Sequence, residues 1–446
     1  MTDERPWAGR RLHFIGIGGA GMSGLALVAL ALGAEVSGSD HAESVTLTRL
    51  REAGCVAGVG HDAANVPSDA EVVYSTAVPE DNPERAVGRE RGQRELHRAD
   101  LLAEITALRR CIAVTGTHGK TTTTSMVVHI LRGCGMDPGY LVGGEVRSTG
   151  SNAGWGAGEW VVVEADESDR SLLKLHPDVA VLTNAELDHH STYGSQLDVD
   201  ETFRTFLARA GEGIVVWDRP ALVALAARAA VPATAYDVPD ALVGADGVRF
   251  DWRGHEVRMR IPGAHNALNA AAALEACRLA GADPARAAAA LADFQGAGRR
   301  FERLGTTPSG AEVYDDYAHH PTEVAATIAA ARTLQPRRVV AVFQPHLYSR
   351  TRALARDFGR ALAAADLVVV LDVYRARERP QDFPGVDGKL IADAAADAAH
   401  GRTVAWLPRF ADAERLLRAR LRAGDVCLAM GAGDVDELGR SLVAPS

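Results

Sequence analysis

Two glycine-rich turns constrain the fold of this chain more than any other feature of its sequence. The first, GIGGAGMSG (16–24), lies between an apolar segment at 12–15 and a helix-like run at 25–32. The second, GTHGKTT (116–122), follows the apolar segment at 111–114. The order of strand, glycine turn and helix is typical of parallel α/β sheets, where a ligand binds beside the turn.

The rest of the chain keeps this alternation of short apolar segments and helical segments. Further buried strands are expected at 35–39, 72–75, near Leu96, and at 160–163, 179–182, 213–216, 338–343, 367–371 and 426–430. Residues 248–261 alternate between polar and apolar side chains, which predicts a hairpin. The alanine-rich segment 265–279 is expected to form one long helix.

The length of the chain bounds the number of domains. At roughly 150 residues per domain, the 446 residues predict three domains. We expect an α/β protein with a Rossmann-like N-terminal domain at 1–109 and a P-loop-type central domain at 110–298 with a mostly parallel sheet. A second Rossmann-like domain is expected at 299–446.

Charge and cysteine usage exclude several classes of protein. The net charge of −10 disfavours binding to nucleic acid or to an anionic membrane. The five cysteines form no CxxC motif, which argues against a disulfide framework or a structural zinc site and fits a reducing cytosol. No apolar run approaches the roughly 20 residues of a membrane span, and residues 1–9 lack a basic signal-peptide stretch. We therefore expect a cytoplasmic protein.

The first turn has the spacing Gly16-x-Gly18-x-x-Gly21, and the next expected strand ends at Asp40. Such a turn lets the backbone approach a phosphate closely and presents the N–H groups of a helix start to it. The spacing indicates a bound diphosphate but is weak support for NAD in particular, because any diphosphate fits this geometry. An NAD-dependent oxidoreductase is one interpretation, and a tight turn without a ligand is another.

The second turn is a phosphate-binding loop of the form GxxGK[ST]. Lys120 would contact the β- and γ-phosphates of a nucleotide, and the Thr121 hydroxyl would bind its Mg²⁺. The loop is shorter than the usual eight-residue pattern, because Val114 stands where the first glycine is expected. Only three of the 48 basic residues are lysines. A lysine kept at this position favours a phosphate grip, since arginine is a poor substitute for a compact ammonium.

Two acidic clusters follow expected strands of the central domain. EADESD (164–169) comes after the strand at 160–163, and NAELDHH (184–190) comes after the strand at 179–182. In open α/β sheets, ligands bind at the carboxyl ends of the strands, and carboxylates there suit the Mg²⁺ of a nucleotide. From its chemistry alone, His189 could equally be a structural hydrogen-bonding residue, and each cluster could be a solvated loop.

Together these motifs resemble the Mur ligases, and within that family they are most similar to the ligases that add L-alanine. The resemblance extends over nearly the whole chain. It rests on twelve segments in order: GIGGAGMSG (16–24), SGSD (37–40), DNPE (81–84), GTHGKTTTT (116–124), EADESD (164–169), NAELDHH (184–190), HNALNA (265–270), GAGRRF (296–301), DDYAHHPTE (315–323), FQPHLYSRTR (343–352), PGVDG (384–388) and GAGDV (431–435). Single segments are weak signals, whereas a dozen in this order are specific.

The resemblance implies a role for each domain and for particular residues. The N-terminal domain would bind a UDP-sugar, not NAD, through Gly16, Gly18, Gly19, Gly21, Met22, Ser39 and Asp40. The central domain would bind ATP through Gly116, Thr117, His118, Gly119, Lys120, Thr121, Thr122 and Asn184, with His265, Asn266 and Asn269 near the adenine. Arg300 and Asp315 would contact the nucleotide from the next domain, and Mg²⁺ would be held by Thr121, Glu164 and His189. The L-alanine site would consist of Tyr317, His319, His346 and Arg350.

The implied reaction is an ATP-dependent ligation in the synthesis of peptidoglycan precursors. The lactyl carboxylate of UDP-N-acetylmuramate would attack the γ-phosphate of ATP, and L-alanine would then attack the acyl phosphate. Catalysis would rest on Lys120, Glu164, His189, His346 and Arg350, with Arg350 facing the amino-acid carboxylate. His319, His320 and His346 are alternatives for the base that deprotonates the amine. We expect a monomer or a weak homodimer.

The sequence departs from the family pattern at two places. Several related ligases use a carbamylated lysine near a second metal, but this chain has no lysine between Lys174 and Lys389. Leu347 stands where some relatives have a basic residue. Other functions that we weighed are a ligase that adds an intact tripeptide to the same sugar nucleotide, folylpolyglutamate synthetase, an NAD-dependent oxidoreductase and a non-catalytic sugar-nucleotide sensor.

Overall fold

The computed structural model describes residues 5–444, and the ends of the two outer expected domains (1–4 and 445–446) lie outside the described residues. The backbone forms two compact units. The first contains the chain up to residue 185 together with 199–236 and 272–290. The second contains 186–198, 237–271 and the chain from residue 291 onward.

The first unit begins with a five-stranded parallel sheet in the order β3-β2-β1-β4-β5. Its strands are β1 (Arg11–Ile15), β2 (Glu35–Asp40), β3 (Val56–Val59), β4 (Glu71–Tyr74) and β5 (Glu95–His97). Its helices are α1 (Ala20–Ala31), α2 (Val45–Glu52), the short 3₁₀ helix η1 (Ala63–Asn65), α3 (Pro83–Glu90) and α4 (Arg98–Thr106). Helix α1 begins directly after the first glycine turn, so its N-terminus lies at the carboxyl end of the central strand β1.

The second sheet of this unit has seven strands in the order β12-β11-β10-β6-β9-β7-β8, and only the β7–β8 pair is antiparallel. Its strands are β6 (Arg110–Thr115), β7 (Gly139–Val146), β8 (Ser151–Gly154), β9 (Trp160–Glu164), β10 (Val179–Leu182), β11 (Gly213–Trp217) and β12 (Ala233–Tyr236). Helix α5 (Lys120–Gly133) follows β6. The central strands are continuous runs of buried valine and isoleucine, as expected for a parallel sheet covered on both faces.

Five further helices occur between the strands of this sheet or after its last strand in the sequence. They are η2 (Ser171–Lys174), α6 (Gln196–Leu207), α7 (Pro220–Ala226), α8 (Ala264–Leu279) and α9 (Pro284–Ala290). Helix α9 packs beside α5, where the His129 ring lies 2.9 Å from the carbonyl oxygen of Ala290.

The second unit contains a small antiparallel sheet and a six-stranded sheet. The small sheet consists of β13 (Leu242–Gly244), β14 (Gly247–Trp252) and β15 (His255–Met259). The larger sheet has the order β16-β17-β21-β18-β19-β20, and only β16 is antiparallel to its neighbour. Its strands are β16 (Glu302–Thr306), β17 (Glu312–Asp316), β18 (Arg338–Phe343), β19 (Leu367–Val370), β20 (Thr403–Trp406) and β21 (Asp425–Met430).

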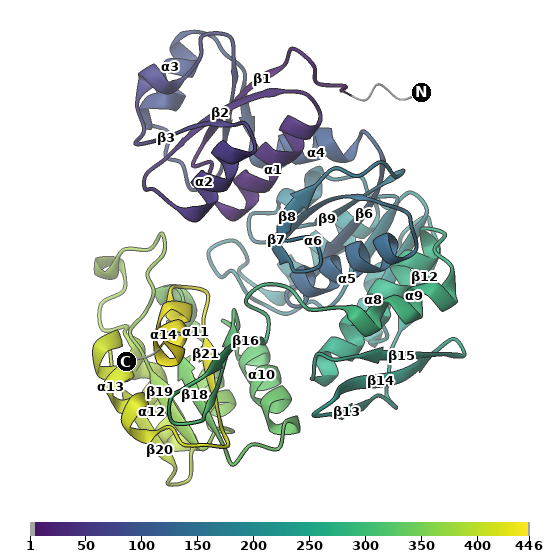
Figure 1. Ribbon diagram of the computed structural model, residues 1–446. Coiled ribbons are helices and arrows are strands. Elements are labelled where there is room, and N and C mark those ends of the chain that lie inside the picture. The colour runs from purple at the N-terminus through teal and green to yellow at the C-terminus, as the bar shows by residue number, and fades with distance from the viewer. Residues whose placement is uncertain (1–4, 445–446) are drawn as a thin grey trace. The chain divides into compact units, whose positions relative to one another are not determined.

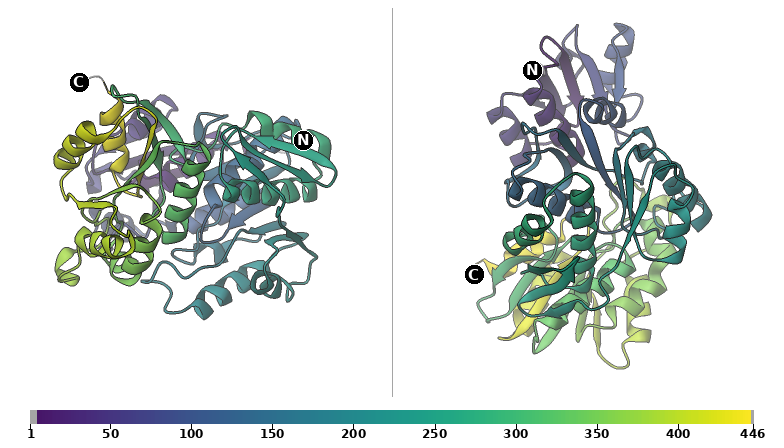
Figure 2. Two further views of the ribbon diagram at one scale, coloured as in Figure 1. Left: turned by 90° about the horizontal axis from the view of Figure 1, so that it is seen from below. Right: turned by 90° about the vertical axis from the view of Figure 1, so that its right-hand side faces the viewer.

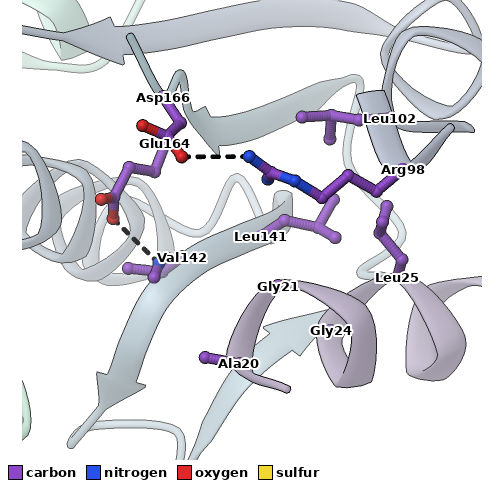
Figure 3. Close-up of a pocket in the computed structure, with 11 residues that line it drawn as sticks. Ala20, Gly21, Gly24, Leu25, Arg98, Leu102, Leu141, Val142, Glu164 and Asp166 are labelled. Carbon is purple, nitrogen blue, oxygen red and sulfur yellow. Dashed lines mark hydrogen bonds and ion pairs between the residues drawn. The ribbon is translucent and has the colours of Figure 1, made fainter. Parts of the chain in front are cut away.

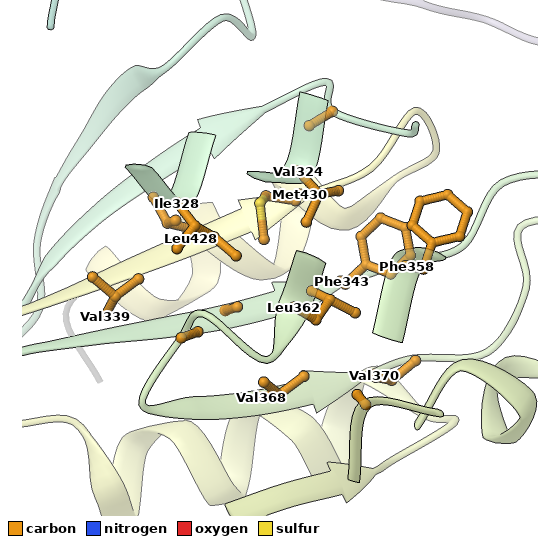
Figure 4. Packing of buried hydrophobic residues seen from close by; sticks show 14 of the residues in the cluster. Val324, Ile328, Val339, Phe343, Phe358, Leu362, Val368, Val370, Leu428 and Met430 are labelled. Carbon is orange, nitrogen blue, oxygen red and sulfur yellow. The ribbon is translucent and has the colours of Figure 1, made fainter. Parts of the chain in front are cut away.

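Helices cover both faces of the six-stranded sheet (Figure 1, Figure 2). They are α10 (Pro321–Thr333), α11 (Tyr348–Leu362), α12 (Gly388–Ala398), α13 (Phe410–Arg420) and α14 (Val435–Val443). The unit also contains two short 3₁₀ helices: η3 (Leu291–Asp293), which lies against β15, and η4 (Pro380–Asp382). Alternate residues of β18 point to opposite faces: Val339 and Phe343 pack with α10, α11 and α12, whereas Val340 packs with α13 and α14. Figure 4 shows the first of these two cores, in which the Phe343 and Phe358 rings lie 4.9 Å apart.

The structure confirms the expected α/β fold with mostly parallel sheets. The expected hairpin is present as β14 and β15, and the alanine-rich helix is α8. We did not predict β3, β7, β8, β12, β13, β16, β17 or β20. Among the described residues, no helix combines the length and the apolar character needed to span a membrane.

Candidate functional site

The phosphate-binding loop joins β6 to α5, and its shape depends on two glycines with positive φ. Gly116 has φ 131°, and a Cβ atom there would lie 2.1 Å from Thr183 Oγ1. Gly119 has φ 80° and is the N-cap of α5. Only glycine fits at position 116, because both its backbone conformation and the neighbouring β10 segment exclude a side chain.

Lys120 is the first residue of α5, and its ammonium folds back over the loop. Nζ donates to the carbonyl oxygens of Gly116 at 2.7 Å and Thr117 at 3.1 Å, and it lies 2.9 Å from the carboxylate of Glu167. Burial alone would lower the pKa of Lys120, but Glu167, Glu164 and Asp166 raise it overall. The side chain is therefore a fixed cation at the start of a helix.

Thr121 and Glu164 meet at the end of β9. The Thr121 hydroxyl donates to Glu164 Oε1 at 3.1 Å, and Glu164 Oε2 accepts a hydrogen bond from the Gly143 amide at 2.8 Å. A hydroxyl and a carboxylate are hard oxygen donors of the kind that Mg²⁺ prefers. The residues present therefore fit a magnesium ion, with Oε1 as the carboxylate oxygen nearest to Thr121.

Asn184, which we expected to contact the nucleotide, holds the loop in place. Its Oδ1 accepts from the His118 amide at 2.8 Å, and its Nδ2 donates to the His118 carbonyl at 3.0 Å. Its backbone carbonyl also accepts from the Thr117 amide at 3.3 Å. These three bonds fix the segment between the two glycines, while Thr122 is buried in the first turn of α5.

The first glycine turn is closed by the carboxylate of Asp40. Gly18 donates its amide to Asp40 Oδ2 at 2.9 Å, and a Cβ on Gly18 would lie 2.9 Å from the same oxygen. The Gly16 amide donates to the carbonyl of Ser39 in β2 at 2.8 Å, and the Gly19 amide donates to the carbonyl of Gly16 at 3.1 Å. The N–H groups of residues 20–22 remain at the start of α1, where helix geometry leaves them without intrahelical acceptors.

Ser39 lies deeper in the N-terminal domain than the turn. It is fully buried, and its hydroxyl donates to the carboxylate of Glu84. The His61 ring lies 2.8 Å from the same hydroxyl. Glu84 is itself fully buried; burial alone would raise its pKa, but hydrogen bonds from His13 and Ser39 lower it to about 2. Ser39 thus links a buried carboxylate to a histidine that follows β3.

A cavity of about 160 Å³ inside the first unit extends from the start of α1 to the end of β9 (Figure 3). At one end lie Ala20 and Gly21 of α1, and at the other lie Glu164 and Asp166. Arg98, the first residue of α4, projects between them. The remaining walls are formed by Gly24, Leu25, Leu102, Leu141, Val142 and Gly143. The expected sugar-nucleotide turn and the expected metal ligand therefore border one space.

In the second unit, Arg350 forms a buried ion pair with Asp188. Its Nε and Nη2 atoms lie 2.8 and 3.0 Å from the two carboxylate oxygens, and both side chains are only 3% exposed. Burial alone would raise the pKa of Asp188, but Arg350 lowers it well below its usual range. Nη1 of Arg350 lies 3.1 Å from His346 Nδ1. The guanidinium is thus held in one orientation.

An aromatic cluster surrounds this ion pair. His346 stacks on Tyr374 with ring centroids 5.8 Å apart and meets the edge of His319 at 6.1 Å, and His319 meets Tyr317 at 5.4 Å. Burial is the main cause that lowers the pKa of His319 to about 4 and that of His346 to about 3. Both rings are therefore neutral at physiological pH.

Asp315 and Arg300 do not pair with each other. Asp315 is fully buried at the end of β17 and binds Arg299 Nε at 3.0 Å, and burial raises its pKa to about 6. Arg300 lies over the Tyr317 ring and 3.8 Å from Glu323. Glu323 in turn completes the capping box of α10 with His320.

The residues expected near adenine lie at the start of α8. His265 is half-buried, and its partial removal from water lowers its pKa to about 4. The Asn266 side chain donates to the Pro262 carbonyl at 2.7 Å. Within residues 5–444, the side-chain amide of Asn269 has no hydrogen-bond partner. His189, in the segment 186–198, has φ 50° and lies 3.8 Å from Asp188.

Four residues of this arrangement were not singled out from the sequence. They are Glu167 beside Lys120, Asp188 beside Arg350, Arg299 beside Asp315, and Arg98 in the cavity. Glu167 and Asp188 lie inside the acidic clusters that the sequence displays, so a signal existed for them. Arg98 lies in no motif that we recognised.

Comparison with known proteins defines the class to which the chain belongs. Three family descriptions match it in order: Mur ligase family, catalytic domain at residues 11–110; Mur ligase middle domain at 114–277; and Mur ligase, glutamate ligase domain at 299–433. The chain belongs to the Mur ligase family.

Particular members of that family are similar over nearly their whole length. The UDP-N-acetylmuramate–L-alanine ligase of Acidithiobacillus ferrooxidans is 44% identical, with 97% of each chain covered. That of Rubrobacter xylanophilus is 45% identical, covering 97% of this chain and 99% of its own. The crystal structure of the UDP-N-acetylmuramate-alanine ligase MurC from Thermotoga maritima matches with a TM-score of 0.81 and 29% identity over 97% of this chain and 98% of its own. A murein peptide ligase from Psychrobacter arcticus matches over the same shares with a TM-score of 0.70 and 27% identity.

Proposed function

We propose that this Mur ligase joins L-alanine to the lactyl carboxylate of UDP-N-acetylmuramate and uses ATP to do so. The observation that carries the proposal is the cavity between the start of α1 and the end of β9. It is bordered by the start of α1, which is suited to a diphosphate, and by Glu164, which contacts Thr121 of the phosphate loop. The similarity to L-alanine ligases over 97% of the chain supports the choice of amino acid.

The chemistry needs activation because a carboxylate has no good leaving group. In the first step, a lactyl carboxylate oxygen attacks the γ-phosphorus of ATP, the bond to the bridging oxygen breaks, and an acyl phosphate and ADP form. In the second step, the amine of L-alanine attacks the acyl carbon, and phosphate leaves with the electrons of the C–O bond. The amine also loses a proton.

The chain contributes position and charge to the first step. Lys120, fixed by Gly116 and Thr117, would neutralise phosphate oxygens, and the loop amides ordered by Asn184 would surround them. We propose that Thr121, Glu164 and His189 bind Mg²⁺, which when bound would neutralise the charge on the transferring phosphate. The other proposed ATP contacts are the loop residues 116–119 and 122, the α8 residues His265, Asn266 and Asn269, and Arg300 and Asp315.

The second unit would supply the amino-acid site. The cluster of Tyr317, His319, His346 and Arg350 offers apolar ring faces around one oriented guanidinium. The two histidines are neutral but weakly basic, because their pKa values lie near 4 and 3. Such rings accept hydrogen bonds from the ammonium of L-alanine better than they remove its proton.

The deciding assay measures phosphate release with ATP, Mg²⁺ and UDP-N-acetylmuramate, supplying each amino acid in turn. We expect release only with L-alanine, and a product larger by one alanine in mass spectrometry. A murein peptide ligase activity would instead give release with L-alanyl-γ-D-glutamyl-diaminopimelate and none with L-alanine. A preference for glycine or L-serine would overturn the amino-acid assignment.

We propose domain boundaries near residues 109 and 298, which fall between the sheets at 11–97, 110–236 and 302–430. We propose that the enzyme acts in the cytoplasm, in keeping with five free cysteines. We propose a monomer or a weak homodimer, which sedimentation analysis would distinguish from a stable oligomer.

A further inference from the structure

Arg98 is the one basic side chain among the residues that line the cavity of the first unit, and it lies outside every motif in the sequence (Figure 3). The other charged lining residues are Glu164 and Asp166. An apolar wall around the guanidinium is formed by Leu25, Leu102 and Leu141. A charge in such surroundings acts more strongly on a ligand than it would in water.

The hydrogen bonds of Arg98 leave part of its guanidinium available. Nη2 alone contacts Asp166 and Asp169, at 3.0 Å each. Within residues 5–444, neither Nη1 nor Nε has a hydrogen-bond partner. Nη1 faces the start of α1, since a methyl group built on Gly21 would lie 3.7 Å from it.

The two aspartates hold the guanidinium in place through Nη2 alone and leave Nη1 available. Burial alone would lower the pKa of Arg98, but Asp166 and Asp169 raise it overall. The walls are also fixed, since Asn152 binds the Ala20 carbonyl at 2.8 Å. The Nη1 N–H groups therefore face the start of α1 in a set orientation, where they can donate a charge-assisted hydrogen bond to a carboxylate oxygen.

We infer that Arg98 binds and orients the carboxylate that is to be phosphorylated. This inference rests on the proposed function, because it assumes that the sugar nucleotide lies in this cavity. A lactyl carboxylate entering from the start of α1 towards Glu164 meets two carboxylates, which repel it. Nη1 of Arg98 offsets that repulsion by binding one carboxylate oxygen and leaves the other oxygen to attack the phosphate. Arg98 is thus a positioning residue that sets the preference for a sugar nucleotide with a carboxylate.

The test compares two ligands that differ in this carboxylate. UDP-N-acetylmuramate has the lactyl group, and UDP-N-acetylglucosamine lacks it. We expect Arg98→Ala to weaken binding of the first by roughly 10- to 100-fold in calorimetry, and binding of the second by less than about twofold. We expect Arg98→Lys to lose much of the same preference, because one ammonium cannot contact both aspartates and the ligand's carboxylate as the guanidinium does. ATP affinity is expected to stay unchanged in both variants.

Arg94→Ala is the matched control. Arg94 belongs to the same domain and also contacts two carboxylates, Glu71 and Glu104, but it is 56% exposed and does not line the cavity. We expect this variant to keep the wild-type preference between the two ligands. If Arg98→Ala weakens both ligands equally, Arg98 contacts the diphosphate or only joins α4 to the Asp166 loop, and the inference is wrong.

The same measurements separate this inference from the proposed function. A wild-type protein that does not bind UDP-N-acetylmuramate would overturn both. A wild-type protein that binds and ligates it, together with Arg98→Ala and Arg98→Lys variants that keep the full preference, would overturn the role of Arg98 alone. The lysine variant keeps a cation beside Asp166 and Asp169, so it remains informative if the alanine variant does not fold.

Discussion

At the scale of single residues, Lys120 has two roles that can be separated. Its ammonium contacts the carbonyls of Gly116 and Thr117, and it is the cation beside the buried carboxylate of Glu167. The first set of contacts places the charge where a phosphate would lie. The ion pair contributes to the stability of the loop whether or not a nucleotide is bound.

The variant Lys120→Ala is expected to lower kcat by about 10²- to 10³-fold, because it removes a preorganised charge from the phosphate. It also takes the lysine charge away from a carboxylate that is 3% exposed, so unfolding is expected to become easier by about 3–5 kcal/mol. Adding Glu167→Gln removes the buried negative charge. The double variant should regain much of the stability in urea unfolding but none of the phosphate release; regained activity would refute the phosphate role.

The buried pair of Asp188 and Arg350 gives a second prediction. Asp188→Asn leaves the guanidinium of Arg350, which is 3% exposed, without its counter-charge. We expect a loss of about 3–5 kcal/mol in the free energy of unfolding, measured with urea. Asp412→Asn is the control, because Asp412 pairs with the exposed Arg409 and Arg415, and its loss should be much smaller. Equal losses in the two variants would contradict this account.

The sequence predicted most members of the candidate site but not their partners. Lys120, Thr121 and Glu164 stand out because their motifs have a fixed spacing along the chain. The pairing of Arg350 with Asp188 joins residues 162 positions apart, and no local pattern encodes it. Arg98 gave no signal at all, because its environment is formed by α1, α4 and the segment after β9.

At the scale of elements, the sequence predicted the strands that are continuous apolar runs, such as β9 and β10. It missed β7 (GYLVGGEV) and β8 (SNAG), because glycine and polar residues interrupt their apolar pattern. It also missed β17 (EVYDD), whose last two residues are buried aspartates. These strands depend on neighbours that cover them: β7 pairs with β9, and β17 pairs with β21.

The turn between β6 and α5 supports a prediction about a single methyl group. Gly116→Ala combines φ 131° with a contact of 2.1 Å to Thr183 Oγ1, so the loop has to move. We expect ATP binding to be lost and thermal stability to fall. Gly254→Ala is the matched control, since Gly254 has φ 83° but open space around it. The control measures backbone strain alone, which is expected to lower the free energy of unfolding by about 1–2 kcal/mol. An equally small effect of Gly116→Ala would show that the loop accommodates the methyl group, and it would contradict this prediction.

At the scale of the whole molecule, the order of motifs was enough to predict three α/β domains and the family. The two compact units were not predictable. The segment 186–198 belongs with residues from 291 onward because of contacts such as that between Glu186 and Thr322, at 2.7 Å across 136 positions. Domain boundaries predicted from the sequence lie between motifs. Compact units are instead defined by which segments pack together, and such packing joins segments far apart in the sequence.

The second unit holds buried groups that make stability depend on pH. Burial lowers the pKa of His265 and His319 to about 4 and that of His346 to about 3, whereas an unfolded histidine titrates near 6.5. As pH falls from about 6.5 to about 4, the unfolded chain therefore binds protons that the folded chain does not, and stability decreases. Burial raises the pKa of Asp315 and Asp316 to about 6, which has the opposite sign over part of this window.

Three histidines outnumber two aspartates, so we expect a net loss of stability when the protein is moved from pH 7 to pH 4.5. Urea unfolding at a series of pH values measures this loss as the slope of the unfolding free energy against pH. Each proton that is taken up only on unfolding adds about 1.4 kcal/mol per pH unit to that slope. Replacing His319 by Gln removes one such proton and should make the slope shallower, whereas Asp315→Asn removes an opposing group and should make it steeper. A slope that is the same in both variants and in the wild type would show that these buried groups do not titrate differently in the folded and unfolded chains.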